Sequence, residues 1–312
     1  MKRTLTLVLA VGLSLALAGC SEPDPSPNEP SLSPKVESNA LAAITWVDGE
    51  PPALRFTEPF ELGQPTAWRL VEPGDGAVVE PGDAVRLDYL LVSGQDGVIL
   101  ASTYAEGSES QPYQLALTEP AGDYLWSALN GQKVGAKVLA AFTDTGETDE
   151  ASGAPATYIA AVTILQSVRP IDKAEGETVQ PEDPSLPVVT IGAAGEPSIE
   201  IPSDAVEPSE LVVQVLIQGQ GQVVEAVDAV TANYTGWLWD GTEFDSSWSR
   251  GQPSTFALSN VITGWRDGLA GLPVGSRVLL VVPPDQGYGE SGQASIPGDA
   301  TLIFVVEILG AV

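Results

Sequence analysis

The residues of this chain that could do chemistry gather near its C-terminus, where they surround one carboxylate and include no nucleophile. The carboxylate is Asp245, and Arg250 follows it closely. The rest of the group is apolar or aromatic and consists of Tyr234, Phe244, Val261, Ile262, Trp265, Tyr288, Ile296 and Phe304. Such a group offers hydrophobic walls and a few hydrogen-bonding groups. It therefore suits a reaction that makes and breaks no covalent bond, such as rotation about a bond.

Composition excludes several other kinds of chemistry. The 312 residues include no histidine and a single cysteine, which rules out Ser-His-Asp and Cys-His mechanisms, most catalytic zinc sites and any intrachain disulfide. We expect neither a cofactor nor a metal. The 13 basic and 42 acidic residues give a net charge of −29, which opposes binding to nucleic acid or to anionic lipid headgroups through the protein surface.

The N-terminus has the pattern of an export signal. Lys2 and Arg3 precede an apolar run at 5–17 that is too short for an ordinary spanning helix and ends in small residues. Residues 17–20, Leu-Ala-Gly-Cys, resemble the lipobox of bacterial lipoproteins, which implies removal of residues 1–19 and acylation of Cys20. We expect an exported protein anchored by lipid to the extracytoplasmic face of a bacterial cell membrane. An ordinary signal with a chance cysteine is the alternative.

Composition and an internal repeat divide the rest of the chain. Residues 20–39 are polar and proline-rich and predict a disordered linker, and 171–186 predict a second, acidic linker. The blocks 40–170 and 187–312 match each other at an offset that stays near 145. Matching pairs include Tyr89 with Tyr234, Asp96-Gly97 with Asp240-Gly241, Leu129 with Leu269, and 134–139 with 274–279. We therefore predict two domains of one fold.

Short β-branched runs in the second block predict a mainly antiparallel sheet. The expected strands are 211–217, 227–238, 278–282 and 302–309. One short helix is also expected, because Val261, Trp265 and Leu269 recur every four residues after Ser259-Asn260, a good helix cap. If the alternating faces of the strands point at this helix, Tyr234, Trp265 and Phe304 meet in one cavity.

The motifs of the second block resemble those of the FKBP-type peptidyl-prolyl cis-trans isomerases. They occur in the family's order at 233–236, 240–247, 261–265, 272–275, 284–289, 296–297 and 300–304. The resemblance implies an α+β fold in which an antiparallel sheet wraps around one short helix, here in two copies. It also implies an enzyme that accelerates rotation about X-Pro bonds, with proline-containing segments of exported proteins as partners and with FK506- or rapamycin-like macrolides as further ligands.

The resemblance also implies a role for each site residue. Trp265 would form the floor under the proline ring, and the walls would be formed by Tyr234, Phe244, Val261, Ile262 and Phe304. Tyr288 would donate its hydroxyl to a substrate carbonyl, with the backbone N–H of Ile296 as a second donor. Asp245 would lie at the pocket edge, held by Arg250 and able to accept a hydrogen bond from Tyr234.

Two departures from the family pattern border the pocket mouth. Ser254 stands where many relatives have an aromatic residue, and the stretch after Gly292 is shortened to Gln293-Ala294-Ser295. Both departures bear on substrate preference and on macrolide affinity more than on the reaction.

The first block keeps the framework of the repeat and loses the pocket. Tyr89 is kept, but Leu100-Ala101 replaces Phe244-Asp245, Leu125 replaces Trp265, Ala160 replaces Phe304, and nothing between Phe142 and Pro155 corresponds to Tyr288. We therefore predict that 187–312 is the isomerase domain and that 40–170 is a degenerate copy. For that copy, a rigid spacer and a protein-binding role are both open. For the whole chain, the alternative function is a chaperone-like or partner-binding lipoprotein that captures proline-containing segments with little turnover.

Overall fold

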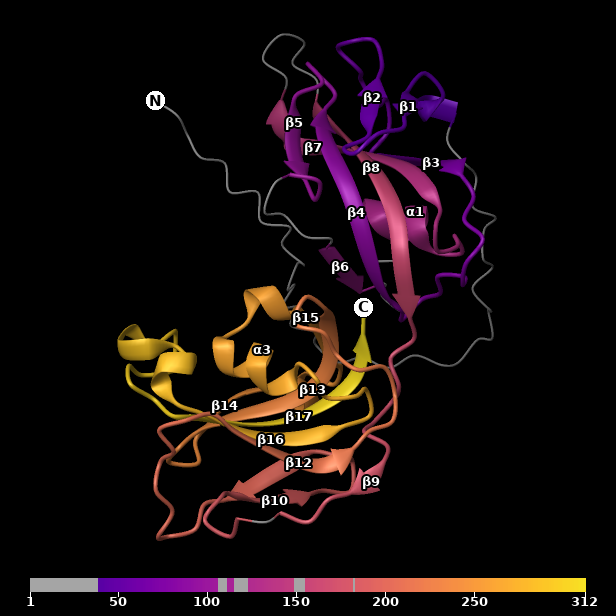
Figure 1. Ribbon diagram of the computed structural model, residues 1–312. Coiled ribbons are helices and arrows are strands. Elements are labelled where there is room, and N and C mark those ends of the chain that lie inside the picture. The colour runs from indigo at the N-terminus through magenta and orange to yellow at the C-terminus, as the bar shows by residue number, and fades with distance from the viewer. Residues whose placement is uncertain (1–38, 106–110, 115–122, 149–154, 182) are drawn as a thin grey trace, which may run out of the picture. The chain divides into compact units, whose positions relative to one another are not determined.

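The computed structural model describes residues 39–312 apart from 106–110, 115–122, 149–154 and 182 (Figure 1). This part of the chain is mostly β-structure in antiparallel sheets, with few and short helices. The expected signal at 1–19, the expected lipid site at Cys20 and nearly all of the expected linker 20–39 lie outside the described residues. No helix that the structure describes is both long enough and apolar enough to span a bilayer.

The C-terminal sheet has the strand order β14-β13-β17-β16-β12-β9, and β15 also pairs with β13. Its main strands are β12 (Val212–Gln218), β13 (Ala229–Leu238), β14 (Glu243–Ser246), β15 (Ser254–Ala257), β16 (Arg277–Val282) and β17 (Leu302–Ala311). The four expected strands correspond to β12, β13, β16 and β17. Strand β17 pairs with β13 on one side and with β16 on the other, and it is buried along its whole length.

The segment 171–186, expected as a linker, contributes a strand to this sheet. Strand β9 (Glu177–Thr178) pairs with the end of β12. The backbone N–H of Glu175 donates to Gly275 and that of Val179 to Leu216, both at 2.9 Å. The acidic composition could not indicate that the backbone of this segment bonds to the edge of the neighbouring sheet.

One short helix, α3 (Thr263–Leu269), lies against the sheet, and its start differs from the expected one. Ser259 and Asn260 do not cap it, because they belong to a separate 3₁₀ turn, η2 (Leu258–Asn260). The N-cap residue is Ile262, which makes no side-chain capping bond. Val261 and Ile262 remain non-helical because their side chains pack against the core around Trp265, so the helix begins only after them.

The N-terminal sheet repeats this connectivity. Its order is β3-β7-β8-β4-β5, with β6 also paired to β4, which matches the order β12-β16-β17-β13-β14 with β15 paired to β13. The elements are β3 (Thr66–Glu72), β4 (Ala84–Ser93), β5 (Ile99–Ser102), β6 (Gln111–Gln114), α1 (Tyr124–Leu129), β7 (Lys137–Thr148) and β8 (Pro155–Val168). The repeat in the sequence therefore recurs as a repeat in strand pairing.

Each sheet has a second apolar face, on the side opposite the helix, and a hairpin packs there. In the C-terminal half, the hairpin of β10 (Val188–Ile191) and β11 (Pro197–Glu200) contributes Val189 and Ile199 to a cluster that includes Trp237. In the N-terminal half, the hairpin of β1 (Thr45–Val47) and β2 (Ala53–Arg55), which follows the turn η1 (Asn39–Leu41), contributes Trp46 and Leu54 to the matching cluster. Both faces of each sheet are thus packed.

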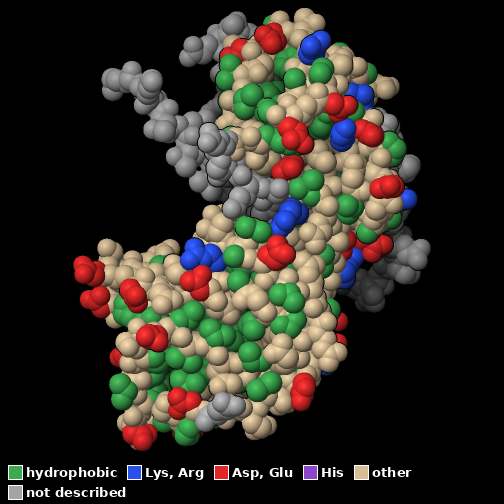
Figure 2. Space-filling model, viewed as in Figure 1, with side chains coloured by type: hydrophobic (Ala, Val, Ile, Leu, Met, Phe, Trp, Pro, Cys, Tyr) green, Lys and Arg blue, Asp and Glu red, His purple; other side chains and the backbone are tan. Residues whose placement is uncertain are grey.

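Acidic side chains are spread over the visible surface, with few basic ones among them (Figure 2). This distribution follows from the excess of 42 acidic over 13 basic residues. Most of the charge is therefore carried outside the two cores.

Candidate functional site

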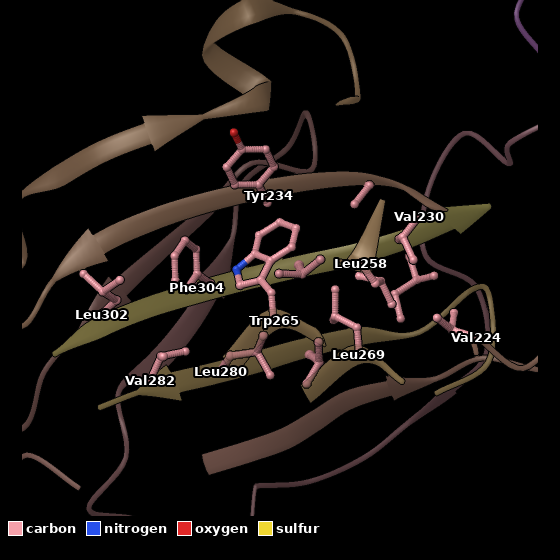
Figure 3. Close-up of a cluster of buried hydrophobic side chains, with 14 of the residues drawn as sticks. Val224, Val230, Tyr234, Leu258, Trp265, Leu269, Leu280, Val282, Leu302 and Phe304 are labelled. Carbon is pink, nitrogen blue, oxygen red and sulfur yellow. The ribbon is translucent and has the colours of Figure 1, made fainter. Parts of the chain in front are cut away.

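The indole of Trp265 is the centre of the candidate site (Figure 3). It projects from α3 toward the sheet and is only 4% exposed. Three rings stand nearly perpendicular to it, with centroid separations of 5.2 Å for Tyr234, 5.4 Å for Phe256 and 5.4 Å for Phe304. Edge-to-face geometry of this kind is favourable for aromatic pairs. The rings therefore form an aromatic enclosure around the indole.

Side chains alternate between the two faces of a strand, and this alternation turns the wall residues toward Trp265. Tyr234 lies on β13 and Phe304 on β17, and both side chains belong to the core cluster that α3 covers. Phe244, on the edge strand β14, meets Phe304 edge to face at 5.6 Å. Tyr234, Trp265 and Phe304, predicted from the sequence to meet, do so.

Phe256 is a wall residue that the sequence prediction omits. Its ring is 5.5 Å from that of Tyr234, and it comes from β15. Strand alternation could have identified it. Phe256 pairs with Val230, and Val230 shares the core-facing side of β13 with Tyr234, so all three side chains point to the same face of the sheet.

Gly236 makes room for the two phenylalanine rings. A Cβ atom at this position would lie 2.6 Å from Cζ of Phe244 and 2.9 Å from Cε1 of Phe304. Any side chain there would push the rings apart. A glycine within a strand pattern often marks such a close approach, which is the sequence signal that could have identified it.

The side chains of Asp245 and Arg250 form an ion pair beside the Tyr234 wall of the enclosure. The Tyr234 hydroxyl donates to Oδ2 of Asp245, and Arg250 donates to Oδ1 of the same carboxylate through Nη1. Arg250 also donates to the Tyr234 hydroxyl through Nη2 at 2.8 Å, and its guanidinium carbon lies 5.5 Å from the centroid of the Tyr234 ring. These three side chains therefore form a closed hydrogen-bonded ring, as the sequence led us to expect.

The surroundings keep the two site tyrosines protonated. Burial, followed by the hydrogen bond to Asp245, raises the pKa of Tyr234 to about 12, although the contact with Arg250 opposes this shift. Burial also raises the pKa of Tyr288, with a smaller contribution from the charge of Asp245. Both hydroxyls are therefore hydrogen-bond donors at neutral pH.

Tyr288 and Ile296 lie on the segment between β16 and β17, which contains the turns η3 (Pro284–Gln286) and η4 (Gly289–Ser291). Both side chains pack against the core cluster around Trp265, with Tyr288 half-buried and Ile296 8% exposed. Within the described part of the chain, the Tyr288 hydroxyl has no hydrogen-bond partner. It is therefore free to donate to a ligand.

The role predicted for the Ile296 amide is wrong in this structure. Its N–H already donates to the carbonyl of Gln293 at 2.8 Å, and Gln293 donates back to Ile296 at 3.0 Å. The shortened stretch after Gly292 is the cause, because it closes a tight turn in which Ala294 has a φ of 49°. The Ile296 N–H is therefore already hydrogen-bonded within this turn and is not available to a ligand.

The backbone N–H of Ile262 is available instead. Ile262 precedes α3 as its N-cap, and among the described residues nothing accepts a hydrogen bond from its amide. The side chains of Val261 and Ile262 are half-buried against the cluster around Trp265. Orphan amides are a general property of helix starts, so the free donor follows from the position of the helix.

The enclosure offers walls and donors but no group that could attack a substrate. The indole N–H of Trp265 is buried, and no described residue accepts a hydrogen bond from it. Within the described ranges, no three His, Cys, Asp or Glu side chains are placed to hold a metal ion. The site can therefore bind an apolar ring, orient a carbonyl and exclude water.

The matching positions of the N-terminal half lack this enclosure. Ala160 pairs with Ala140 where Phe304 pairs with Leu280, and Leu125 is the buried residue of α1 that corresponds to Trp265. Three other rings stack there: Tyr124 on Phe142 at 4.1 Å, and Phe142 on Tyr158 at 5.1 Å. These three rings, of which Tyr124 belongs to α1, therefore form a stack in place of an enclosure around a tryptophan.

Comparison with known proteins matches residues 221–309 to the family model of the FKBP-type peptidyl-prolyl cis-trans isomerases. Over 99 residues the chain is 46% identical to the FKBP-type peptidyl-prolyl cis-trans isomerase FkpA of Escherichia coli (strain K12), a match that covers 32% of this chain and 37% of FkpA. Over 117 residues it is 38% identical to a probable FK506-binding protein of Corynebacterium glutamicum, a match that covers 37% of this chain and 98% of that protein.

A solved structure of FkpA from Escherichia coli is also similar to the chain. It has 36% sequence identity and a TM-score of 0.33, and the match covers 42% of this chain and 53% of that one. The chain thus spans less than half of the length of the Escherichia coli protein in the sequence comparison, at 37%.

Proposed function

This chain belongs to the family of FKBP-type peptidyl-prolyl cis-trans isomerases, and on that premise we propose that its C-terminal half accelerates rotation about X-Pro bonds. The match at 38% identity covers 98% of a relative from Corynebacterium glutamicum. The observation that carries the proposal is the enclosure of Trp265 by Tyr234, Phe256 and Phe304, which presents the aromatic surface that an apolar proline ring would contact.

The physical basis is the electronic structure of the peptide bond. Resonance keeps the bond planar with a barrier of roughly 20 kcal/mol, and an unassisted X-Pro bond isomerises in tens to hundreds of seconds. The twisted transition state loses this resonance, and with it the charge separation that water stabilises in the planar amide. A dry aromatic site therefore favours the twisted state relative to the planar one, and each 1.4 kcal/mol of that preference is worth about tenfold in rate.

Two donors at the edge of the site would hold the peptide during rotation. The Tyr288 hydroxyl and the Ile262 amide have no partner among the described residues, and both belong to residues that pack around Trp265. We assign them to carbonyl groups of the bound segment. The ring of Tyr234, Asp245 and Arg250 keeps the Tyr234 wall in place and leaves no uncompensated charge beside the proline.

A protease-coupled assay with a proline-containing peptide tests the proposal on the full chain. We expect acceleration over the uncatalysed rate, and we expect it to be lost in a variant that carries Trp265→Ala. If the wild-type chain gave no acceleration, the proposed function would be wrong. The alternative, capture of proline-containing segments with little turnover, would then require peptide binding that quenches or shifts tryptophan fluorescence without any change in the isomerisation rate.

For the N-terminal half we propose a degenerate copy of the same fold without isomerase activity. Its repeated strand order supports the common fold, and Ala160 and Leu125 at the positions of Phe304 and Trp265 support the loss of activity. An exposed apolar run favours a partner-binding role over that of a spacer, because Val98, Ile99 and Leu100 are 52%, 56% and 41% exposed. Replacing Ile99 with Ser should then weaken assisted refolding of a whole protein and leave peptide isomerisation unchanged.

We also propose export and lipid anchoring through Cys20, with proline-containing segments of exported proteins as partners. The Leu-Ala-Gly-Cys sequence at 17–20 after a basic and apolar start supports this proposal. Each buried methylene contributes about 0.8 kcal/mol, so a single acyl chain gives only marginal, reversible binding to the membrane. Stable anchoring therefore needs more than one acyl chain. Incorporation of labelled fatty acid into the wild-type chain, and its loss in a Cys20→Ser variant, tests the anchor.

Binding of FK506- or rapamycin-like macrolides is a further proposal for the same site. It rests on the aromatic enclosure and on the likeness to a relative named as a probable FK506-binding protein. Ser254, to which Arg250 donates at 3.4 Å, offers little apolar surface at the edge of the site. Inhibition of the peptide assay by FK506 tests the proposal, and a Ser254→Phe variant should be inhibited at lower concentrations.

A further inference from the structure

One stretch of β13 has no backbone partner on the side of β14 and β15. The pairing with β15 covers Ala229–Ala232, and the pairing with β14 resumes at Thr235. Between these points the neighbouring chain leaves the sheet as the short helix α2 (Ser247–Arg250). Asn233 and Tyr234 therefore face a gap in the hydrogen-bond ladder, next to the wall residue of the site.

The side chain of Ser247 fills this gap. It is completely buried, and its Oγ accepts the backbone N–H of Tyr234 at 2.8 Å. The Ser247 hydroxyl lies 3.2 Å from Oδ1 of Asn233 and 3.3 Å from the carbonyl of Tyr234, either of which can accept its proton. A buried amide without an acceptor costs free energy, so Ser247 takes the place of the missing strand at this residue.

The same helix also positions the hydroxyl of Tyr234. Ser246 caps α2 by accepting the Ser249 amide at 3.4 Å, and it bonds the Thr235 hydroxyl at 3.0 Å. Arg250, the last residue of α2, donates to the Tyr234 hydroxyl. The backbone and the hydroxyl of Tyr234 are therefore fixed by the first and last residues of one helical turn.

We propose that Ser247 is a positioning residue for the isomerase reaction, acting through Tyr234. It sets the position of the Tyr234 backbone relative to α2, so that the hydroxyl meets Asp245 and Arg250 while the ring stands against Trp265. This inference rests on the proposed function, because it assigns Ser247 to the reaction of the same site. Ser247 has no contact with substrate in this assignment and acts only through the geometry of Tyr234.

A double-mutant cycle on the full chain tests the proposal. Ser247→Ala should lower kcat/KM for a proline peptide about tenfold, through kcat more than through KM, because the geometry of the rotating state is disturbed. A Tyr234→Phe background lacks the hydroxyl that Ser247 helps to position. In that background, Ser247→Ala should lower the logarithm of kcat/KM by at most about half as much as it does in the wild-type chain. Ser247→Thr, which keeps a hydroxyl, should recover most of the activity.

Ser249→Ala is the matched control, because Ser249 lies on the same helix, is exposed, and among the described residues its side chain hydrogen-bonds only to Glu243, at 3.5 Å. It should keep wild-type activity. Circular dichroism at the assay temperature confirms that each variant is folded. Equal effects of Ser247→Ala in the wild-type chain and in the Tyr234→Phe background would overturn the positioning role alone. A wild-type chain without isomerase activity would overturn the proposed function and this role together.

Discussion

The backbone N–H of Ile296 donates to the carbonyl of Gln293 at 2.8 Å, in a turn that folds back on itself within four residues. This bond removes from the site an amide that the family resemblance assigned to the substrate. On the proposed function, we assign donation to the peptide to the Tyr288 hydroxyl and the Ile262 amide, which have no partner among the described residues.

The Tyr288 hydroxyl should contribute a hydrogen bond to the bound peptide. Tyr288→Phe keeps the ring in the core cluster and removes only this donor. A hydrogen bond worth about 1 kcal/mol predicts a loss in kcat/KM of about fivefold. The peptide assay measures it, and Tyr124→Phe, which removes a hydroxyl from the stacked rings of the N-terminal half, serves as the control with unchanged activity. Full activity of Tyr288→Phe would show that the hydroxyl does not reach the substrate.

The indole of Trp265 should be required for activity beyond its role in the core. Trp265→Leu places in α3 the residue type that α1 has at Leu125, so the helix can still pack. We expect kcat/KM to fall at least about tenfold, because the floor and three edge-to-face contacts are lost.

The matched control for Trp265 is Trp237, which is similarly buried at 5% exposure but belongs to the cluster on the opposite face of the same sheet. Trp237→Leu should reduce the free energy of unfolding to a similar extent and leave kcat/KM unchanged under folding conditions. Equal losses of activity in both variants would attribute the effect to stability.

Gly236→Ala should damage the site without unfolding the sheet. The added Cβ would lie 2.6 Å from Phe244 and 2.9 Å from Phe304, so the two rings must separate. We expect a loss in kcat/KM of about tenfold or more. Gly310→Ala is the control in the same sheet, since its Cβ would make only ordinary contacts at 3.5 Å or more. Unchanged activity of Gly236→Ala would mean that the pair of rings does not shape the site.

The isomerase rate should be nearly constant between about pH 6 and 8, since the chain has no histidine and both site tyrosines stay protonated. Stability should respond at higher pH. Tyr234 has a pKa of about 12 in the folded chain and about 10 when unfolded, so the unfolded state loses its proton first. The contribution of Tyr234 is therefore complete below about pH 10 and is lost as pH rises toward 12.

Urea unfolding at stepwise pH measures this decline, which should be shallower in Tyr234→Phe. A Tyr234→Phe variant with the same decline would show that another group titrates in this range. A bell-shaped rate profile between pH 6 and 8 would contradict the assignment of neutral donors to the site.

The buried ion pair between Arg277 and Glu307 should stabilise the C-terminal sheet without affecting the reaction. The two residues face each other on β16 and β17, Nε of Arg277 lies 2.8 Å from Oε1 of Glu307, and their side chains are 13% and 2% exposed. Glu307→Gln leaves Arg277 without its charge partner, which should cost about 3–5 kcal/mol in the free energy of unfolding.

Chemical denaturation measures the effect, and the double variant Arg277→Met with Glu307→Leu should recover most of the stability, because an apolar pair can replace a buried ion pair. Activity of the folded variants should remain at the wild-type level. A fall in activity at constant stability would place this pair in the reaction.

Much of the fold and of the site could be predicted because both rest on local regularities. The alternation of Val230, Ala232 and Tyr234 fixes one face of a strand, and the four-residue spacing of Trp265 and Leu269 fixes one stripe of a helix. These periods determine which side chains share a core. They are sufficient to predict that Tyr234 and Trp265 meet.

Other features were missed because they depend on which backbone groups remain unpaired once the strands meet. The helix starts at Thr263 because the side chains of Val261 and Ile262 pack against the core. Strand β9 forms because the edge of β12 has backbone groups free to pair with it. The amide of Ile296 is hydrogen-bonded within its own turn, and the amide of Tyr234 faces a gap that the side chain of Ser247 fills.

The sequence by itself therefore determined the residue types of the site, their order and the faces they occupy. The tertiary structure decided which donors are free, which aromatic residues complete the enclosure, and which hydroxyl holds Tyr234 in place. The reason is physical: side-chain periodicity is a property of one segment, whereas the satisfaction of a buried amide depends on the register between segments that are far apart in the chain.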